Sequence, residues 1–273
     1  MSTLPTMAAG PQLDAATVLL QWATGGLLFC WVTTRRGELG VGYGWLLRAS
    51  YAAVAVLAAL AGYGWASEPL RDAASVGVAT AAAGALLLSI IRRHSHPTPQ
   101  PSQTKETAPS FDPRWDLLAP AIGTIGLVAA GIGGGGNELL QTARILVGAA
   151  FLGCVTDAML LGHWYLIQPG LRREPLLEQV SWLGRLWPLE VGLLIVPTGM
   201  ISVLTGAIDD SYGGMLGWFW SACALTTGAL VIVTRAALRE RQYAAVMAAT
   251  GLLYLAILTA FGTDVVARLV LET

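Results

Sequence analysis

Positive charge alternates along this chain between the gaps that separate its apolar segments. About 20 apolar residues are needed to cross a bilayer. The segments that meet this length are roughly 16–34, 44–66, 73–91, 116–133, 143–167, 186–207, 214–234 and 243–263. Thirteen of the sixteen Lys and Arg residues, Arg48 and Arg185 among them, lie in or beside alternate gaps. The other three, Arg71, Arg144 and Arg268, lie on the opposite side of the predicted membrane. Because basic loops stay in the cytoplasm, the pattern predicts an all-α bundle of eight transmembrane helices with both termini outside.

The composition indicates a membrane protein independently of the charge pattern. The chain is 55% hydrophobic and only 12% charged, with a mean hydropathy of +0.60. These values are typical of a multi-pass protein of the inner (plasma) membrane, for which the lipid bilayer is the main partner. The net charge of −1 and the lack of a basic tract argue against a nucleic-acid partner. The three cysteines lie inside apolar segments without paired spacing, so we expect neither a disulfide framework nor a metal site.

A Pro-rich stretch interrupts the series of apolar segments. Residues 94–114 carry five prolines among Ser, Thr and Gln, which predicts a flexible cytoplasmic linker. The first membrane part, 1–93, then holds three helices, and 115–273 holds the other five. Two further patterns have weak functional interpretations. His94 and His96 are too few to hold a metal, and the Gly-rich run 131–136 lacks the strand that a dinucleotide-binding motif requires.

The first and fifth segments share an order of Thr, apolar residues, Trp and a double Arg. This gapped similarity suggests a four-plus-four duplication, in which both copies have the same orientation. Pro197 lies inside an apolar run and should kink the sixth helix. Its ring removes a helical hydrogen bond, so the carbonyl that it frees needs a neighbouring donor or a water molecule.

Three ionisable residues fall at membrane depth, where such groups are costly and functional sites are common. They are Asp157, His163 and Glu190. Asp157 lies near the middle of the fifth helix. His163 and Glu190 are expected at similar depth, in the cytoplasmic half, and Arg48 is the expected counter-ion for Glu190 or Asp157. A structural ion pair is the alternative to a functional role for these acids.

The run 162–175 concentrates groups that suit an aromatic ligand. His163 can exchange protons near neutrality. Trp164 and Tyr165 would form an apolar wall for a flat ring, and Arg172 would mark the cytoplasmic edge of the site. The alternative is that the aromatic residues are interfacial anchors, the arginines set the topology and His163 bonds a neighbouring helix.

These residues lead to a first hypothesis, a membrane subunit that binds a quinone near the cytoplasmic side within an electron-transfer complex. His163 and Glu190 would handle protons, and other membrane or peripheral subunits would supply the catalytic head. In helix number and outward termini the chain resembles the cofactor-free, eight-helix quinol anchors of molybdoenzyme complexes, and His163, Pro169, Arg172 and Glu190 follow the order of polar residues in those anchors. The resemblance is one of architecture. A self-contained bis-His haem is not expected, because the segments hold one histidine.

Two hypotheses from other classes remain open. In the second, the chain is a proton-coupled transporter of a small solute, with Asp157 as the coupling group and the Pro197 break and the repeat providing alternating access. In the third, it is a structural or assembly subunit without a site of its own.

Overall fold

The computed structural model describes residues 13–65, 67–95, 112–133, 137–168, 170–197, 199–240 and 242–271. Within these residues the chain forms nine α-helices and one 3₁₀ helix. They are α1 (Ala15–Thr34), α2 (Val41–Trp65), α3 (Pro69–Ser95), η1 (Pro113–Leu117), α4 (Leu118–Gly133), α5 (Glu138–Ile167), α6 (Glu174–Ile195), α7 (Gly199–Leu204), α8 (Met215–Arg239) and α9 (Tyr243–Leu271). The expectation of an all-α fold is confirmed for this part of the chain. Most of the expected linker 94–114, and residues 134–136 of the Gly-rich run, lie outside the described residues.

Polar side chains fix where several helices begin. The Asp14 carboxylate accepts hydrogen bonds from the backbone N–H groups of Ala16 and Thr17 at the start of α1. Asn137 caps α5 in the same way, by accepting from the N–H of Leu140. A helix leaves its first N–H groups without partners, so such caps set the boundaries that hydropathy alone does not resolve.

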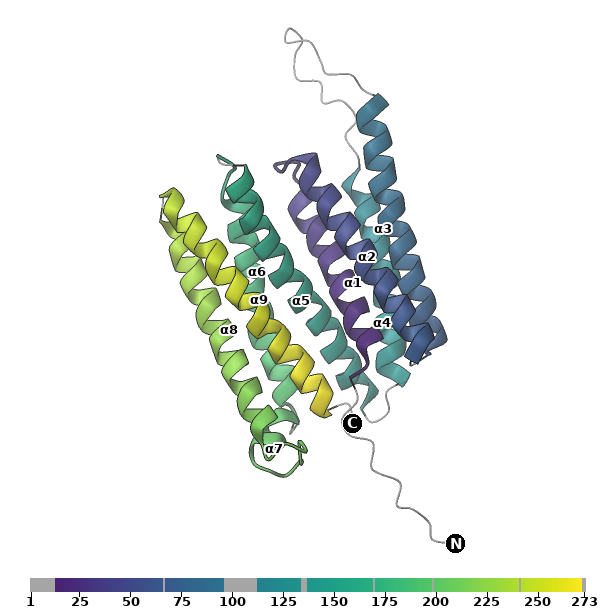
Figure 1. The fold of residues 1–273 in the computed structure, drawn as a ribbon, viewed down its shortest axis with the longest axis vertical. Coiled ribbons are helices and arrows are strands. Elements are labelled where there is room, and N and C mark those ends of the chain that lie inside the picture. Colours follow the sequence, from purple (N-terminus) through teal and green to yellow (C-terminus); the bar gives the residue numbers. More distant parts are fainter. Residues whose placement is uncertain are drawn as a thin grey trace.

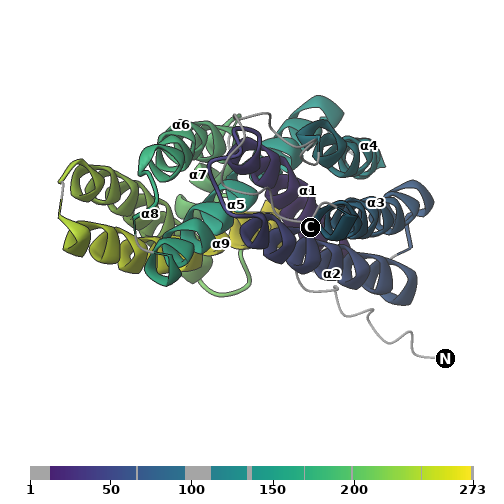
Figure 2. The same ribbon diagram turned by 90° about the horizontal axis from the view of Figure 1, so that it is seen from above.

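The long helices form two rings of four that lie side by side (Figures 1 and 2). In the first ring α1 packs against α2 and α4, and α3 packs between α2 and α4. In the second ring α5 packs against α6 and α9, and α8 packs between α6 and α9. The first helices of the two rings, α1 and α5, make the main contact between them, and α4 also packs against α5. Thus α4, which follows the linker in sequence, completes the first ring rather than joining the second.

Glycines allow α1 and α5 to cross closely. A Cβ added to Gly25 would lie 1.7 Å from the carbonyl oxygen of Ala149, and one added to Gly153 would lie 2.0 Å from the carbonyl carbon of Gly25. Two side chains of α1 add polar bonds across the same contact. The Gln21 amide donates to the carbonyl of Ile145 at 2.8 Å, and the Trp22 indole donates to the Thr156 hydroxyl at 3.0 Å.

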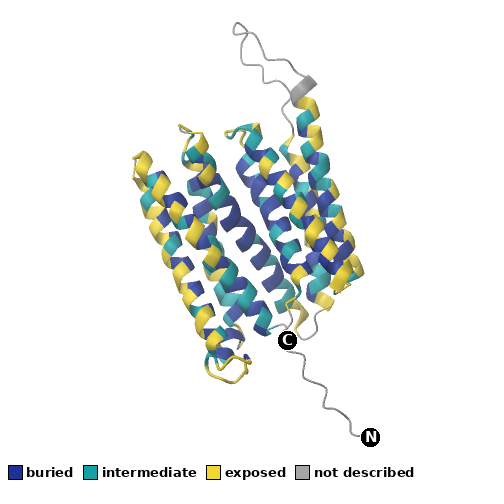
Figure 3. Ribbon diagram, in the orientation of Figure 1, coloured by how far each residue is buried: buried dark blue, intermediate teal, exposed yellow. Residues whose placement is uncertain are grey.

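Seven of the described helical segments are long and apolar enough to cross a membrane, namely α1 to α5, α8 and α9, with η1 counted into α4. Their outward faces carry many exposed apolar side chains, and the buried residues are concentrated on α1 and α5, where the two rings meet (Figure 3). Together these observations indicate a multi-pass membrane protein. The remaining long helix, α6, has 22 residues and carries charged side chains at Glu174, Glu178, Arg185 and Glu190.

The sixth and eighth helices differ from the sequence-based boundaries. The expected segment 186–207 is wrong by more than two turns, because α6 begins at Glu174 and ends at Ile195. A search for apolar runs passes over the first half of α6, where one face is polar. Arg185 therefore lies inside α6 rather than at its start. The eighth expected helix corresponds to α9, which continues to Leu271, beyond the expected end at residue 263.

Candidate functional site

Asp157 lies at the junction of the two rings, and its side chain is completely buried. Its Oδ1 accepts a hydrogen bond from the hydroxyl of Tyr51 on α2, and its backbone carbonyl accepts one from the Tyr43 hydroxyl at 3.3 Å. The Tyr51 ring reaches this position over Gly26 of α1, where an added Cβ would lie 2.0 Å from the ring. Among the described residues Oδ2 of Asp157 has no hydrogen-bond partner. The carboxyl thus belongs to the second ring and is bound by a side chain of the first ring.

Arg48 does not pair with Asp157 or Glu190, so the expected counter-ion assignment is wrong. Its guanidinium binds Asp116 with two parallel bonds, Nε to Oδ1 at 2.7 Å and Nη2 to Oδ2 at 2.6 Å. Both side chains are buried, at 4% and 3% exposure. Asp116 lies in η1, just before α4, at the edge of an apolar segment. The sequence analysis overlooked it because its distance from Arg48 in the chain gives no sign of the contact.

Glu190 lies near the opposite end of the bundle from His163, so the expectation that the two share a depth is also wrong. Glu190 is fully buried, and its charged surroundings are Asp264, Arg268 and Arg144. Arg144 and His163 are 19 residues apart on α5, which corresponds to about 28 Å at the helical rise. The difference arises because α6 begins at Glu174, so Glu190 lies 16 residues into the helix and not near its start.

The surroundings of Glu190 form a buried charge cluster that the sequence analysis did not find. Arg268 binds the Asp264 carboxylate one turn earlier on α9, with Nε to Oδ2 at 2.9 Å, and donates to the carbonyl of Arg144 at 3.3 Å. Neither oxygen of Glu190 accepts a hydrogen bond from a described donor group. The Asp264 and Arg268 spacing of four was the available signal, but it lay beyond the expected end of the last helix.

The groups of the run 162–175 point in different directions. His163 is exposed and its Nδ1 lies 3.2 Å from the Tyr254 hydroxyl on α9. The Trp164 ring instead packs toward α2, 5.8 Å from the Tyr43 ring. Tyr165 is buried and donates its hydroxyl to the carbonyl of Arg172, whose own side chain is exposed. Successive helical residues differ by about 100° in direction, so these groups do not line one common pocket. Pro169 lies outside the described residues.

Pro197 lies beyond the end of the sixth helix and does not kink a continuous helix, in contrast to the sequence-based prediction. The helix ends at Ile195, and α7 begins at Gly199. The carbonyl of Leu193, four residues before the proline, accepts from Nε of Arg144 at 2.9 Å, and the carbonyl of Val196 accepts from Nη2 at 2.8 Å. The expectation that a neighbouring donor satisfies the freed carbonyl is confirmed, and the donor is a charged group of α5.

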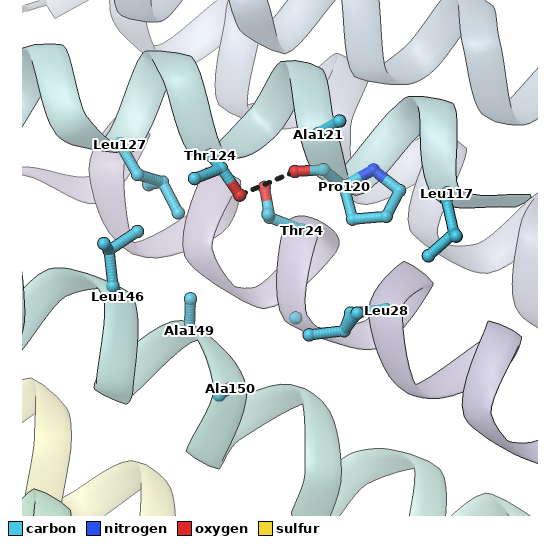
Figure 4. Close-up of a pocket in the computed structure, with 11 residues that line it drawn as sticks. Thr24, Leu28, Leu117, Pro120, Ala121, Thr124, Leu127, Leu146, Ala149 and Ala150 are labelled. Atoms are coloured by element: carbon cyan, nitrogen blue, oxygen red, sulfur yellow. Dashed lines mark hydrogen bonds between the residues drawn. The ribbon is translucent and has the colours of Figure 1, made fainter.

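An apolar groove of about 310 Å³ opens on one face of the junction between the rings (Figure 4). It lies between α4 and α5, and α1 forms its floor. The lining includes the small residues Thr24, Gly25, Ala149 and Ala150 from the middle of α1 and α5, and Ala121 from the first turn of α4. Figure 4 also shows the Thr124 hydroxyl turned back to the Pro120 carbonyl, at 2.8 Å, so it presents little free polarity to the groove.

The fold and the buried polar groups define an all-helical, multi-pass membrane protein with ionisable groups at its core. No protein-family model matches the chain, and no match is found among curated proteins or among solved structures. The assignment of a function therefore rests on the site itself.

Proposed function

We propose that the protein couples the movement of protons to the transport of a small solute, and that Asp157 carries the proton. The observation that carries this proposal is the Asp157 carboxyl, which is fully buried at the junction of the rings with one tyrosine donor and, among the described residues, one oxygen that lacks a partner. An ionised side chain at the centre of a membrane helix costs at least about 2.5 kcal/mol. Without a cation, the neutral acid is the favoured form, and such an acid can bind and release a proton as its surroundings change.

The arrangement of the helices supports a coupled movement. Asp157 belongs to the second ring, and its donor Tyr51 belongs to the first. A small rotation of one ring against the other, about the close α1–α5 crossing, would break this bond and change the access of the carboxyl. The matching order of helix contacts in the two rings supports a four-plus-four repeat with parallel copies, the arrangement in which substrate sites lie at the interface of the repeats.

The proposal includes a topology. In this topology α6 crosses the membrane in addition to the seven other helices, which gives eight spans. The helix ends that carry Arg35, Arg36, Arg172 and Arg173 face the cytoplasm of an inner membrane, and both termini lie outside.

The second candidate is the quinone-linked subunit, and one observation favours it. His163 and Tyr254 place an imidazole and a phenol 3.2 Å apart at the exposed surface of α5 and α9, where a ring dissolved in the lipid could reach both. Glu190 takes no part in this version, because it lies at the other end of the bundle. We rank this candidate second because Trp164 and Tyr165 face away from the pair.

Proton coupling can be measured in liposomes that hold the purified protein and a pH-sensitive dye. With a panel of small solutes outside, at least one solute class should drive proton uptake through the wild type. The variant Asp157→Asn should lose this uptake and keep its fold, and Asp209→Asn, which alters an exposed loop, should behave as the wild type. Unchanged uptake in Asp157→Asn would refute the role of this residue. Quinol-dependent activity lost in His163→Ala but kept in Asp157→Asn would favour the second candidate.

Chemical labelling tests the proton on Asp157 whatever the solute is. An apolar carbodiimide reacts with neutral carboxyls inside the bilayer. We expect it to modify Asp157 and to spare Asp116, which is held as a carboxylate by Arg48. Peptide mapping by mass spectrometry identifies the modified residue, and modification of Asp116 without Asp157 would contradict the proposal.

A further inference from the structure

Glu190 is a buried carboxyl that neither candidate function uses. Its side chain has no exposed surface, and among the described residues neither of its oxygens has a hydrogen-bond partner. A carboxylate that is buried without a donor is costly, because it loses its hydration and gains no bond in exchange. The neutral acid is therefore the favoured form, unless a neighbouring cation holds the group ionised.

The charges around Glu190 come from α5 and α9, and they are Asp264, Arg268 and Arg144. Arg268 is engaged with Asp264 through two bonds, Nε to Oδ2 at 2.9 Å and Nη2 to Oδ1 at 3.1 Å. Such a bidentate pair satisfies both partners. Arg144 donates to the Leu193 carbonyl at the end of α6. Both arginines thus have partners of their own, and neither donates to Glu190.

The other two helices packed against α6 add no charged group at this level. The short helix α7 holds no ionisable residue. The Trp187 indole, one turn before Glu190, donates to the Ala224 carbonyl of α8 at 2.8 Å. The first arginine of α8, Arg235, is eleven residues further along, or about 16 Å away. Cys223 of α8 lies against α9.

A second buried acceptor at this cluster also lacks a donor. Gln21 of α1 is fully buried, and its Oε1 has no partner among the residues that the structure describes. A Cβ added to Gly148 of α5 would lie 2.9 Å from Nε2 of Gln21 and 2.5 Å from Oδ1 of Asp264. The amide therefore borders the cluster. With the two oxygens of Glu190, the cluster is short of donors rather than of acceptors.

A pocket of about 210 Å³ reaches the cluster from the end of the second ring. Asn137, Gln141 and Arg144 of α5 line it, together with Ile208 of the loop after α7. Arg144 belongs both to the pocket and to the surroundings of Glu190, whereas Glu190 itself does not line the pocket. A solute in the pocket is thus separated from Glu190 by the arginine.

We propose that Glu190 is a second proton-binding group, which exchanges its proton with water in this pocket past Arg144. The proton passes from hydronium to a Glu190 oxygen and leaves a water molecule. It supplies the donor that the cluster lacks and leaves the Asp264–Arg268 pair intact. A metal cation at the same place would meet two guanidinium groups, and an anion would meet carboxyl oxygens. The inference does not depend on Asp157, which lies 13 residues after Arg144 on α5, or about 20 Å away.

Infrared spectroscopy of the full-length protein in liposomes measures this proton directly. In neutral buffer an ordinary Glu is ionised, so the carbonyl stretching band of a neutral carboxyl reports a buried proton. We expect Glu190→Gln to lose such a band. Glu174→Gln, which removes an exposed carboxyl from the start of the same helix, should keep it. Asp157→Asn should remove a different component, so the tests of the two carboxyls are separate.

Isotope labelling and exchange test the site without removing Glu190. In the wild type, ¹³C-labelled glutamate should shift the band assigned to Glu190 and leave the Asp157 component in place. Ile208→Trp fills the pocket from its loop, and it should slow the deuterium shift of the Glu190 band after transfer to heavy water, with the Asp157 component unaffected. The proposal is overturned if the wild type has no neutral Glu band, if Glu190→Gln keeps that band, or if Ile208→Trp exchanges it as fast as the wild type.

Discussion

Substitution of Gly25 by alanine tests the packing that joins the two rings. The new Cβ would lie 1.7 Å from the Ala149 carbonyl oxygen, and real Cβ contacts are essentially never shorter than 3.0 Å. The atoms that the new Cβ would meet belong to the α5 backbone, so a change of side-chain rotamer cannot relieve the clash. The α1 and α5 helices must therefore separate by more than 1 Å, and a gap of 0.5–1 Å already forfeits about a quarter to a half of a dispersion contact.

The magnitude follows from two opposed effects. Alanine in a helix is favoured over glycine by about 0.5–1 kcal/mol, whereas overpacking of a close contact costs about 1–3 kcal/mol. The contact at Gly25 is far tighter than an added methylene in a core, so we expect net destabilisation of about 1–3 kcal/mol. The measurement is the unfolding of the purified protein in mixed micelles as the fraction of denaturing detergent rises.

Gly84→Ala is the matched control, because Gly84 lies inside α3 and an added Cβ would meet nothing within 4 Å. It should leave stability unchanged or raise it by up to about 1 kcal/mol. The double variant Gly25→Ala/Gly153→Ala should cost less than the sum of the single variants, because one separation of the helices relieves both contacts. Equal stability of Gly25→Ala and Gly84→Ala would refute the reasoning.

Two further predictions concern buried and loop carboxylates. Asp116→Asn should destabilise the protein by about 3–5 kcal/mol, because it leaves the Arg48 charge buried without its counter-ion. In the same unfolding assay, the double variant Arg48→Met/Asp116→Leu should recover most of this lost stability. If the double variant does not recover this stability, the Arg48–Asp116 pair does more than neutralise two buried charges. Asp210, in the loop before α8, accepts from the backbone N–H groups of Gly214, Tyr212 and Leu216, which lowers its pKa below the usual value of 3.8. The stability that ionised Asp210 gives the loop should therefore be complete above that usual value and be lost as the pH falls through the lower pKa of the folded state. Amide-exchange protection of the loop measures this loss. Asp210→Asn should lose the Leu216 bond and this pH dependence, and an unchanged pH profile in the variant would contradict the assignment.

The helical class and most of the helix positions were predictable because they depend on local properties. A run of about 20 apolar residues must satisfy its backbone groups internally, and in lipid a helix does so. The same argument failed for α6, where Glu178 and Arg185 make one face polar and obscure its start. It also failed for the end of α9, where Asp264 and Arg268 neutralise each other and allow the helix to continue.

The candidate site, like the fold, has some features that follow from local sequence and others that depend on tertiary contacts. The sequence by itself determined that Asp157 and His163 belong to a helix long and apolar enough to cross a membrane, and that Pro197 would release a carbonyl. Only the tertiary structure decided that Arg48 binds Asp116, that Arg144 binds the freed carbonyl, and that Tyr51 holds Asp157. Residue type and spacing report the cost of burying a group in lipid. The partner that offsets this cost is set by which helices pack together and at what register, and that depends on contacts between residues far apart in the chain.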